Sequence, residues 1–342
     1  MAADALLEVE DLRVNFYLNE GTVHAVDGVS FTIPRGKTLG VVGESGCGKS
    51  VTARAILNMV KYPGRIEGGS IRYYGDPQRP VEISSQAPRG EAMRHIRWGE
   101  IAMIFQEPMT SLSPVHTIGN QMVEAIRLHE KVGKKEAEAR SVELFQRVGL
   151  PRPERLLERY RHELSGGMRQ RVMIAMALSC NPKLLIADEP TTALDVTTQA
   201  QILDLMKSLQ EEYGMAIMFI THDLGVIAQV ADEVVVMYLG KEVELTDVDK
   251  IFYGAAHPYT QALLRSIPRH DQSVDRLETI KGAVPDPTRV PAGCAFHPRC
   301  PHYKPKACAN PPFAEVRPGQ WARCARVYEI NDHLQAPVAE PA

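Results

Sequence analysis

The stretch GESGCGKS, residues 43 to 50, is the feature that most restricts how this chain can fold. It has the spacing of a phosphate-binding loop, which is a glycine, four residues, and then Gly-Lys-Ser. The apolar run TLGVVG precedes it, and a helical pattern begins at Lys49. In such a unit, backbone N–H groups and the helix N-terminus converge on the phosphates of a nucleoside triphosphate. The flanking strand and helix disfavour the alternative, a glycine-rich turn without a ligand.

The loop and the start of the helix supply the predicted phosphate contacts. Lys49 brings a positive charge to the β- and γ-phosphates, and the hydroxyl of Ser50 is expected to hold Mg²⁺. The predicted nucleotide-binding residues of this segment are Gly43, Ser45, Gly46, Cys47, Gly48, Lys49, Ser50 and Val51. The motif is specific for a nucleoside triphosphate but leaves the class of enzyme open.

A pair of carboxylates follows a second apolar run, KLLIADEP. This run predicts a buried strand that delivers Asp188 and Glu189 to its C-terminal end, where α/β sheets bind ligands. Asp188 is expected to reach Mg²⁺ through water, and Glu189 to polarise the water that attacks the γ-phosphate. A solvated strand end is the alternative, but the phosphate-binding loop makes it a poor one.

The order of apolar patterns along the chain predicts an α/β sheet domain with a helical insertion. KLLIAD and AIMFIT are continuous apolar runs, typical of parallel strands covered on both faces. The helix beginning at Lys49 is expected to pack Val51, Ala55 and Met59 against the sheet. Residues 76 to 99 have the polar character of a surface excursion, and residues 117 to 182 have helical periodicity. Near residue 268 the composition changes to that of a linker.

Charge and hydropathy exclude several classes of protein. The formal net charge of -3 gives no basic footprint, so no nucleic acid is expected as a partner. No basic segment followed by an apolar run opens the sequence, and no apolar stretch reaches membrane-spanning length. We therefore expect the chain in the cytosol, where clustered cysteines favour metal binding or redox work over disulfides.

The segment LSGGMRQR, residues 164 to 171, resembles the signature motif of ATP-binding cassette (ABC) ATPases. A Ser-Gly-Gly sequence that opens a helix can bind an anion through exposed backbone N–H groups. The resemblance implies that this motif contacts the γ-phosphate held by an opposite subunit, so that each ATP site is completed by a second chain. The residues assigned to it are Leu164, Ser165, Gly166, Gly167, Arg169 and Gln170.

Other positions match the family one by one. Gln106 in IFQEP matches the glutamine that contacts Mg²⁺ and the attacking water, and His222 in FITHD matches the histidine that contacts the γ-phosphate. With Glu189, these two residues form the implied catalytic set. Asp195 in ALD matches the loop that crosses to the other subunit. Phe16 matches the aromatic that stacks on adenine, and its neighbour Tyr17 is the alternative.

Two longer stretches, IFQEPMTSLSPVHTIGNQMVEAI and HPYTQALLRSIP, resemble the ATPases of oligopeptide and dipeptide importers. The resemblance covers residues 6 to 325. It implies a P-loop cassette at residues 1–256, with a RecA-like core, an antiparallel β subdomain and a helical signature subdomain at about residues 108–182. A small irregular metal-binding extension is then expected at residues 257–342.

The resemblance implies an ATP-hydrolysing subunit that couples ATP binding and hydrolysis to peptide import. Its implied partners are a second ATPase subunit, usually a different chain in this branch, two transmembrane permease subunits and an extracytoplasmic solute-binding protein. The expected location is the cytoplasmic face of the inner membrane, as a peripheral protein. The alternative is a soluble cassette ATPase acting on ribosomes or DNA, but residues 51 to 163 are too short for the coiled coil of DNA-repair relatives. The sequence leaves the cargo open.

Four cysteines crowd the C-terminal region, namely Cys294, Cys300, Cys308 and Cys324. Four thiolates suit zinc or an iron-sulfur cluster. Structural zinc sites usually contain tight Cys-x₂₋₄-Cys knuckles, which are absent here, whereas the Cys300-Pro301 step is reminiscent of ferredoxin-type runs. The importer branch shares this cysteine spacing, and some members carry a [4Fe-4S] cluster. We therefore expect a [4Fe-4S] cluster, with zinc or unligated thiols as alternatives.

Overall fold

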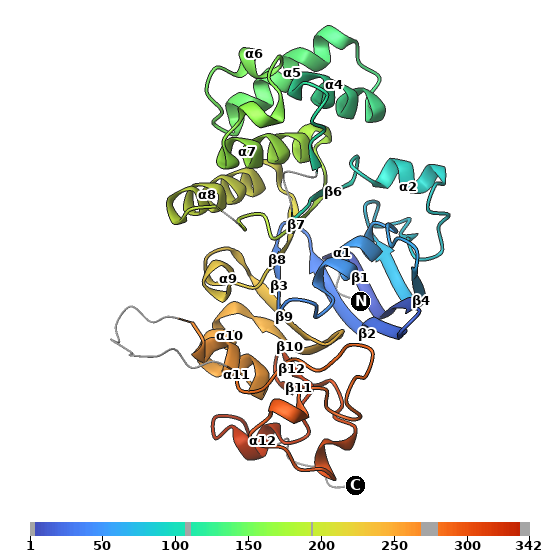
Figure 1. Cartoon of the computed structure of the whole chain (residues 1–342), viewed down its shortest axis with the longest axis vertical. Coiled ribbons are helices and arrows are strands. Elements are labelled where there is room, and N and C mark those ends of the chain that lie inside the picture. Colours follow the sequence, from blue (N-terminus) through green and yellow to red (C-terminus); the bar gives the residue numbers. More distant parts are fainter. Residues whose placement is uncertain (1–3, 107–110, 193, 268–279, 336–342) are drawn as a thin grey trace.

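The computed structural model describes residues 4–106, 111–192, 194–267 and 280–335, and within them two β-sheets form the centre of the molecule (Figure 1). The larger sheet has eight strands in the order β11-β12-β10-β9-β3-β8-β7-β6. Its strands are β3 (Thr38–Val42), β6 (Ile101–Ile104), β7 (Leu184–Asp188), β8 (Ala216–Thr221), β9 (Glu233–Tyr238), β10 (Lys241–Asp247), β11 (Ala314–Arg317) and β12 (Gln320–Ala322).

The five strands from β9 to β6 run parallel and are buried on both faces. Side chains alternate along each strand, so Leu184 and Ile186 of β7 face one core and Leu185 and Ala187 face the other. This two-sided burial explains why these strands are uninterrupted apolar runs in the sequence. The expectation of parallel strands at KLLIAD and AIMFIT agrees with this arrangement.

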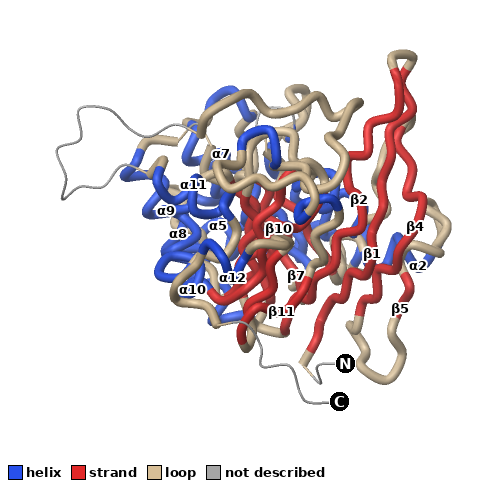
Figure 2. The backbone as a smooth tube through the Cα atoms, turned by 90° about the horizontal axis from the view of Figure 1, so that it is seen from below, coloured by secondary structure: helices blue, strands red, loops and turns tan. Residues whose placement is uncertain are grey.

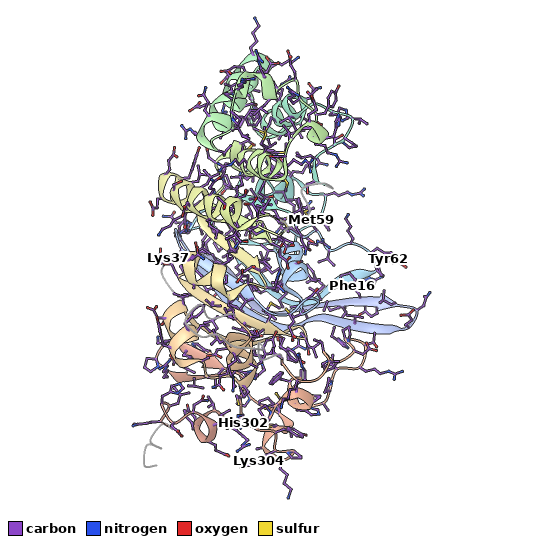
Figure 3. The ribbon with its side chains drawn as sticks, turned by 60° about the vertical axis from the view of Figure 1, so that its left-hand side comes forward. Phe16, Lys37, Met59, Tyr62, His302 and Lys304 are labelled. Carbon is purple, nitrogen blue, oxygen red and sulfur yellow. The ribbon has the colours of Figure 1, made fainter. Side chains whose placement is uncertain are left out.

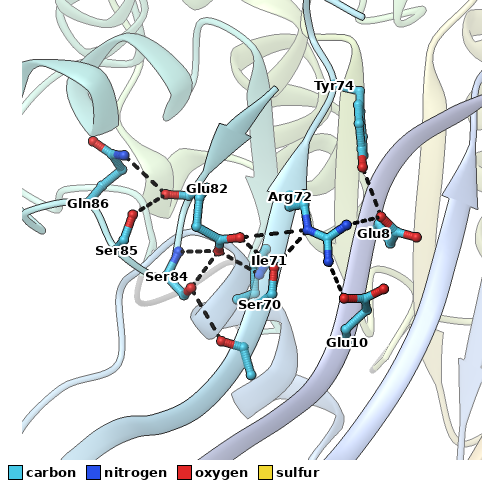
Figure 4. A network of polar contacts seen from close by, with 11 residues as sticks. Glu8, Glu10, Ser70, Ile71, Arg72, Tyr74, Glu82, Ser84, Ser85 and Gln86 are labelled. Carbon is cyan, nitrogen blue, oxygen red and sulfur yellow. Dashed lines mark hydrogen bonds and ion pairs between the residues drawn. The ribbon is translucent and has the colours of Figure 1, made fainter. Parts of the chain in front are cut away.

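The second sheet is antiparallel, has the order β2-β1-β4-β5, and covers one face of the larger sheet (Figure 2). Its strands are β1 (Ala5–Leu18), β2 (Gly21–Pro34), β4 (Gly64–Tyr73) and β5 (Val81–Glu82). Across its two central strands, Arg72 pairs with Glu8 and Glu10, and Tyr74 donates a hydrogen bond of 2.9 Å to Glu8 (Figure 4). This network joins β1 to β4 on the side away from the core.

Helix α1 (Lys49–Ile56) packs in the core between the two sheets. The helix ends at Ile56, before Met59, and is therefore shorter than its sequence pattern predicts. Its buried side chains after Lys49 are Thr52, Ala53, Ala55 and Ile56. Of the predicted face, Ala55 is fully buried, and Val51 and Met59 are partly buried against the same core. A helix enclosed by two sheets buries most of its circumference, and single-face periodicity does not describe such a helix.

A group of helices beyond the β6 end of the main sheet forms a separate lobe in Figure 1. Its elements are α4 (Ile118–His129), α5 (Lys134–Arg147), α6 (Pro153–Leu156) and α7 (Gly166–Ala177), with 3₁₀ turns at Arg161–Glu163 and Leu178–Cys180. Residues 108–110, where the expected subdomain begins, lie outside the described residues. The segment 76–99 is not wholly a surface excursion, because α2 (Glu91–Ile96) buries Met93 and Ile96 in the core.

The remaining helices lie on the side of the main sheet opposite the antiparallel sheet (Figure 2). They are α8 (Val196–Tyr213), α9 (Leu224–Val230), α10 (Val248–Gly254) and α11 (Pro258–Arg265). The expected linker begins at residue 268, and residues 268–279 lie outside the part of the chain that the structure describes. From residue 280 onward the chain packs against the cassette again. Its last described helix is α12 (Val327–Ile330).

The C-terminal region is continuous with the cassette rather than a separate module. The β11–β12 hairpin extends the main sheet, with Glu244 of β10 paired to Ala322 of β12. Phe296 is fully buried in the main core with Tyr238 and Tyr259, whose ring centroids both lie 5.3 Å from its own. The region therefore shares the core of the cassette.

Glu244 is fully buried at this junction and accepts three hydrogen bonds. The donors are the backbone N–H groups of Ala256 at 2.7 Å and His257 at 2.9 Å, and the side-chain amide of Gln320 at 2.7 Å. Burial raises the pKa of this carboxyl group, while the hydrogen bonds oppose the rise. One side chain therefore joins β10, the chain entering α11, and β12.

We expect Glu244→Ala to lower the free energy of unfolding by about 3 kcal/mol, because buried donors lose their acceptor. Glu244→Gln keeps one carbonyl oxygen and is the matched control, with a smaller expected loss. Denaturant unfolding of the two variants measures the difference. Equal losses would show that the hydrogen bonds to Glu244 do not hold the junction together.

Candidate ATP site

The phosphate-binding loop runs between β3 and α1, and its shape depends on glycine at two positions. Gly43 has φ +153°, and a Cβ there would lie 2.2 Å from the carbonyl oxygen of Met237. Gly48 has φ +105°, and a Cβ there would lie 2.3 Å from the carbonyl oxygen of Ala25. Both contacts are with backbone, which cannot move aside. The two outer glycines of the motif are therefore required by close packing as well as by backbone conformation.

Lys49 is buried and bends back over the loop. Its Nζ donates hydrogen bonds to the carbonyl oxygens of Gly43 at 2.7 Å and Glu44 at 3.1 Å. The adjacent Ser50 donates a hydrogen bond from Oγ to Oδ1 of Asp188 at 2.9 Å. The structure thus brings together two of the three residues that the sequence assigned to Mg²⁺, although Ser50 and Asp188 are 138 positions apart.

The two carboxylates after β7 have different environments. Asp188 is buried at the strand end, and burial raises its pKa, with the Ser50 hydrogen bond opposing the rise. Glu189 has φ +48°, a conformation that non-glycine residues seldom adopt and that is frequent at functional sites. This backbone turn directs the two neighbouring side chains to different partners.

Glu189 lies at the centre of the predicted catalytic set. Gln106 donates a hydrogen bond of 2.9 Å to its carboxylate, Thr192 donates one of 3.0 Å, and Nδ1 of His222 lies 3.5 Å from Oε1. Burial is the largest single influence and raises the pKa of Glu189, but Thr192, His222 and Gln106 together outweigh it and lower the pKa. Glu189 is therefore ionised at neutral pH and can accept a hydrogen bond from water.

Two cavities adjoin the loop on opposite sides. The first is lined by Val23, His24, Ala25, Ser45, Gly46, Cys47, Gly48, Lys49, Ser50, Val51, Gln106, Glu189, Leu239, Gly240, Pro287 and Val290. The second is lined by Gly43, Glu44, Ser45, Gln106, Glu189, His222, Leu263, Ser266, Ile280, Gly282, Val284 and Arg299. Every predicted residue of the phosphate-binding loop lines one of them, and so does each of the three catalytic side chains. The C-terminal region contributes walls to both.

The two candidate aromatics lie elsewhere on the antiparallel sheet. Neither Phe16 nor Tyr17 is part of the described cavity linings. Phe16 packs against Gly64, and in Figure 3 it lies in the region of Met59 and away from the cysteine-rich end. Tyr17 is 46% exposed and donates a hydrogen bond of 2.8 Å to Glu67. Stacking on adenine by either residue stays a prediction.

The signature segment lies apart from both cavities. Ser165 caps α7 by accepting a hydrogen bond of 3.3 Å from the backbone N–H of Met168. Ser165 and Gly166 are exposed, whereas Leu164 and Gln170 are buried. Asp195 caps α8 in the same way, accepting from Thr198 N at 2.9 Å, and this hydrogen bond lowers its pKa. Both helix N-termini therefore present exposed polar groups away from the loop of the same chain.

Sequence reasoning missed two sets of contacts at the site. Thr192 lies close to Glu189 in the sequence, so the sequence itself gave an indication of their hydrogen bond. Arg299 had none, because it lies 255 positions from its partner Glu44. The cysteine-rich region lies far along the chain from the phosphate-binding loop, and Arg299 nevertheless brings it into contact with the ATP site.

The four C-terminal cysteines line one small cavity together with His257, Phe296, His302 and Arg326. Burial raises the pKa of Cys294 to about 11 and that of Cys324 to about 12. Backbone groups of Phe296, His302 and Arg326 hydrogen-bond to the sulfurs of Cys294, Cys300 and Cys324. Among the described residues, no three His, Cys, Asp or Glu side chains are arranged to hold a single metal ion.

The comparisons with known proteins agree with the site. Residues 26–192 match the ABC transporter family, and residues 243–308 match the C-terminal region of oligopeptide/dipeptide transporters. The chain is 50% identical over 321 residues to the oligopeptide transport ATP-binding protein AppD of Bacillus subtilis, covering 93% of this chain and 96% of AppD. The chain belongs to the ABC transporter ATPases of the oligopeptide/dipeptide type. It is therefore an ATPase with the cassette fold.

Solved structures support the same fold for this ABC ATPase. The dimeric bacterial ABC transporter cassette MJ0796 has a TM-score of 0.62 at 24% identity and covers 71% of this chain and 98% of its own. The cbiO1 protein from Clostridium perfringens, part of the cbiONQ transporter complex, has a TM-score of 0.60 at 27% identity, with coverages of 73% and 92%. No helix in the described ranges is long and apolar enough to cross a membrane.

We expect Glu189→Gln to lower the rate of ATP hydrolysis by about 100-fold or more while ATP still binds, because the variant loses the ionised water-polarising carboxylate. Phosphate release and equilibrium ATP binding measure the two properties separately. Thr192→Val is the matched control, since it removes one hydrogen bond to Glu189 and keeps the carboxylate. Hydrolysis by Glu189→Gln within a few-fold of wild type would contradict the assigned role.

Proposed function

We propose that this chain hydrolyses ATP to drive peptide import through a membrane permease. The observation that carries the proposal is the assembled set of Ser50 with Asp188 and of Glu189 with Gln106 and His222. This set stands in a chain that is 50% identical to an oligopeptide transport ATP-binding protein. We further propose a cassette at residues 1–256 and an importer-type extension at residues 257–342.

The geometry assigns a task to each side chain. Lys49 would exchange its two backbone carbonyl contacts for phosphate oxygens when ATP binds, because an ammonium group interacts more strongly with a negatively charged oxygen than with a neutral carbonyl oxygen. Ser50 and Asp188, with Gln106, hold Mg²⁺, which neutralises charge on the phosphates. Glu189 orients and polarises the attacking water. His222, 62% exposed, is free to contact the γ-phosphate.

A second ATPase subunit completes the site in this proposal. The exposed N-terminus of α7 with Ser165 lies away from its own loop and can serve the ATP of the partner, and Asp195 at the start of α8 belongs to the loop that would cross to that partner. The anion-binding character of such helix starts makes ATP the link between two subunits. A second, different chain is the proposed partner.

A permease segment is the proposed occupant of a groove next to Gln106. The groove is lined by apolar side chains and edged by basic ones, including Leu57, Met59, Arg94, Arg97, Trp98, Phe105, Leu128 and Met176. Phe105 joins its floor directly to the catalytic Gln106, so occupancy of the groove can be sensed at the ATP site. Two permease subunits and an extracytoplasmic binding protein would place the ATPase on the cytoplasmic face of the inner membrane.

Uptake of labelled di-, tri- and pentapeptides by the native host tests the transport function. Cells carrying Glu189→Gln are expected to accumulate less than about one tenth of the wild-type amount of at least one peptide, because hydrolysis drives the cycle. Membrane fractionation checks where the chain resides. Unchanged uptake of all peptides, with the chain on ribosomes or DNA, would favour the rival hypothesis of a soluble cassette ATPase, which the matches above do not support.

We also propose that the four cysteines hold a [4Fe-4S] cluster, with zinc as the alternative. Four thiols on one cavity and backbone hydrogen bonds to their sulfurs support a thiolate site. A cluster separates its thiolates more widely than a single ion does, which suits residues not arranged around one point. Such a group would carry positive charge into the cavity and stabilise thiolates that burial alone disfavours.

Metal analysis of anaerobically purified protein tests this assignment. We expect about four irons and four acid-labile sulfides per chain, and Cys308→Ser is expected to lower both by more than half because it removes one of four ligands. Cys180→Ser is the control, since Cys180 lies in the 3₁₀ turn after α7 and outside the cavity. One zinc without sulfide would support the alternative, and neither metal would contradict both.

A further inference from the structure

Glu44, the second residue of the phosphate-binding loop, is fixed at three points. Arg299 donates two hydrogen bonds to its carboxylate, one from Nη1 to Oε2 at 2.6 Å and one from Nη2 to Oε1 at 3.0 Å. We call this two-bond contact the fork. The backbone N–H of Glu44 donates to the hydroxyl of Tyr259 at 2.9 Å, and its carbonyl oxygen accepts from Lys49. The position of the loop therefore depends on groups that lie far outside the motif.

Arg299 is itself held rigidly. Its side chain is only 3% exposed, and its guanidinium carbon lies 5.9 Å from the ring centroids of both Tyr238 and Phe296. Nε donates to the carbonyl oxygen of Lys281 at 3.3 Å. A planar guanidinium in a two-bond fork has a fixed orientation, which a lysine could not reproduce. The fork thus fixes Glu44 relative to the C-terminal region.

The same short turn that carries Arg299 also carries a thiol of the cysteine cavity. The 3₁₀ turn His297–Arg299 ends at Cys300, whose backbone N–H donates to the carbonyl oxygen of His297 at 3.3 Å. Arg299 leaves this turn toward the ATP site, and Cys300 faces the cavity shared with the other three thiols. A movement of the turn would therefore be felt at both sites.

We propose that Arg299 is a positioning residue for the ATP-binding loop and that, through Glu44, it makes nucleotide affinity depend on the cysteine cavity. The proposal rests on the proposed ATP-binding function and extends it to a coupling between two sites. Disturbing the cavity shifts the turn, weakens the fork and loosens the loop that must present its N–H groups to the phosphates. The coupling passes through one pair of side chains, so a substitution of either residue can remove it while the catalytic side chains and the four cysteines stay in place.

Equilibrium binding of ATP with Mg²⁺ to the full-length chain is the test, with a double-mutant cycle at its centre. Arg299→Lys and Glu44→Gln are each expected to weaken ATP binding about 10-fold, and the double variant no further than the weaker single one. Cys300→Ser is expected to weaken binding several-fold in the wild-type background and not in the Glu44→Gln background. Cys180→Ser is the control and should leave affinity unchanged in both.

Denaturant unfolding of the same variants separates positioning from loss of fold. Glu44→Gln, at a partly exposed carboxylate, is expected to keep its unfolding midpoint close to wild type while affinity falls. Unchanged ATP affinity in Arg299→Lys and Glu44→Gln would overturn the inference, as would equal effects of Cys300→Ser in both backgrounds. Wild-type protein that fails to bind ATP would contradict the proposed function as a whole.

Discussion

The two-sided burial of the parallel strands is the constraint on which the rest of this structure depends. Because β3, β7 and β8 are covered on both faces, polar side chains can leave them only at their ends. The carboxyl ends share one edge, where the loop with Lys49, the pair Asp188 and Glu189, and His222 meet. The site is therefore a consequence of how the sheet is buried.

Electrostatics then gives neighbouring groups at that edge different properties. Asp188 is buried next to Ser50, and burial raises its pKa while the Ser50 hydrogen bond opposes the rise. Glu189 receives hydrogen bonds from Gln106 and Thr192, which keep it ionised without a metal. The surroundings of the two neighbouring carboxylates shift their pKa values in opposite directions, which suits the proposed division between metal binding and water activation.

The C-terminal region also reaches this carboxyl edge of the main sheet. It adds strands to the main sheet beyond β10, places Phe296 in the shared core, and reaches the loop through Arg299. Glu244 holds its entry by three hydrogen bonds. The extension is thus a structural part of the ATPase. The short turn that carries Arg299 links its cysteine cavity to the phosphate-binding loop.

Local motifs in the sequence determined the fold class and the candidate catalytic set, because a phosphate-binding loop or a strand ending in Asp188-Glu189 is specified within a few residues. The cassette fold and the ATPase family were predictable from the resemblance of LSGGMRQR to the ABC signature motif. Helix α1 buries Thr52, Ala53 and Ile56 as well as the predicted Ala55, because two sheets enclose it and cover more than one face. Only the tertiary structure decided that Arg299 meets Glu44 and that the extension joins the core, since contacts between residues 255 positions apart arise from chain packing and leave no local pattern.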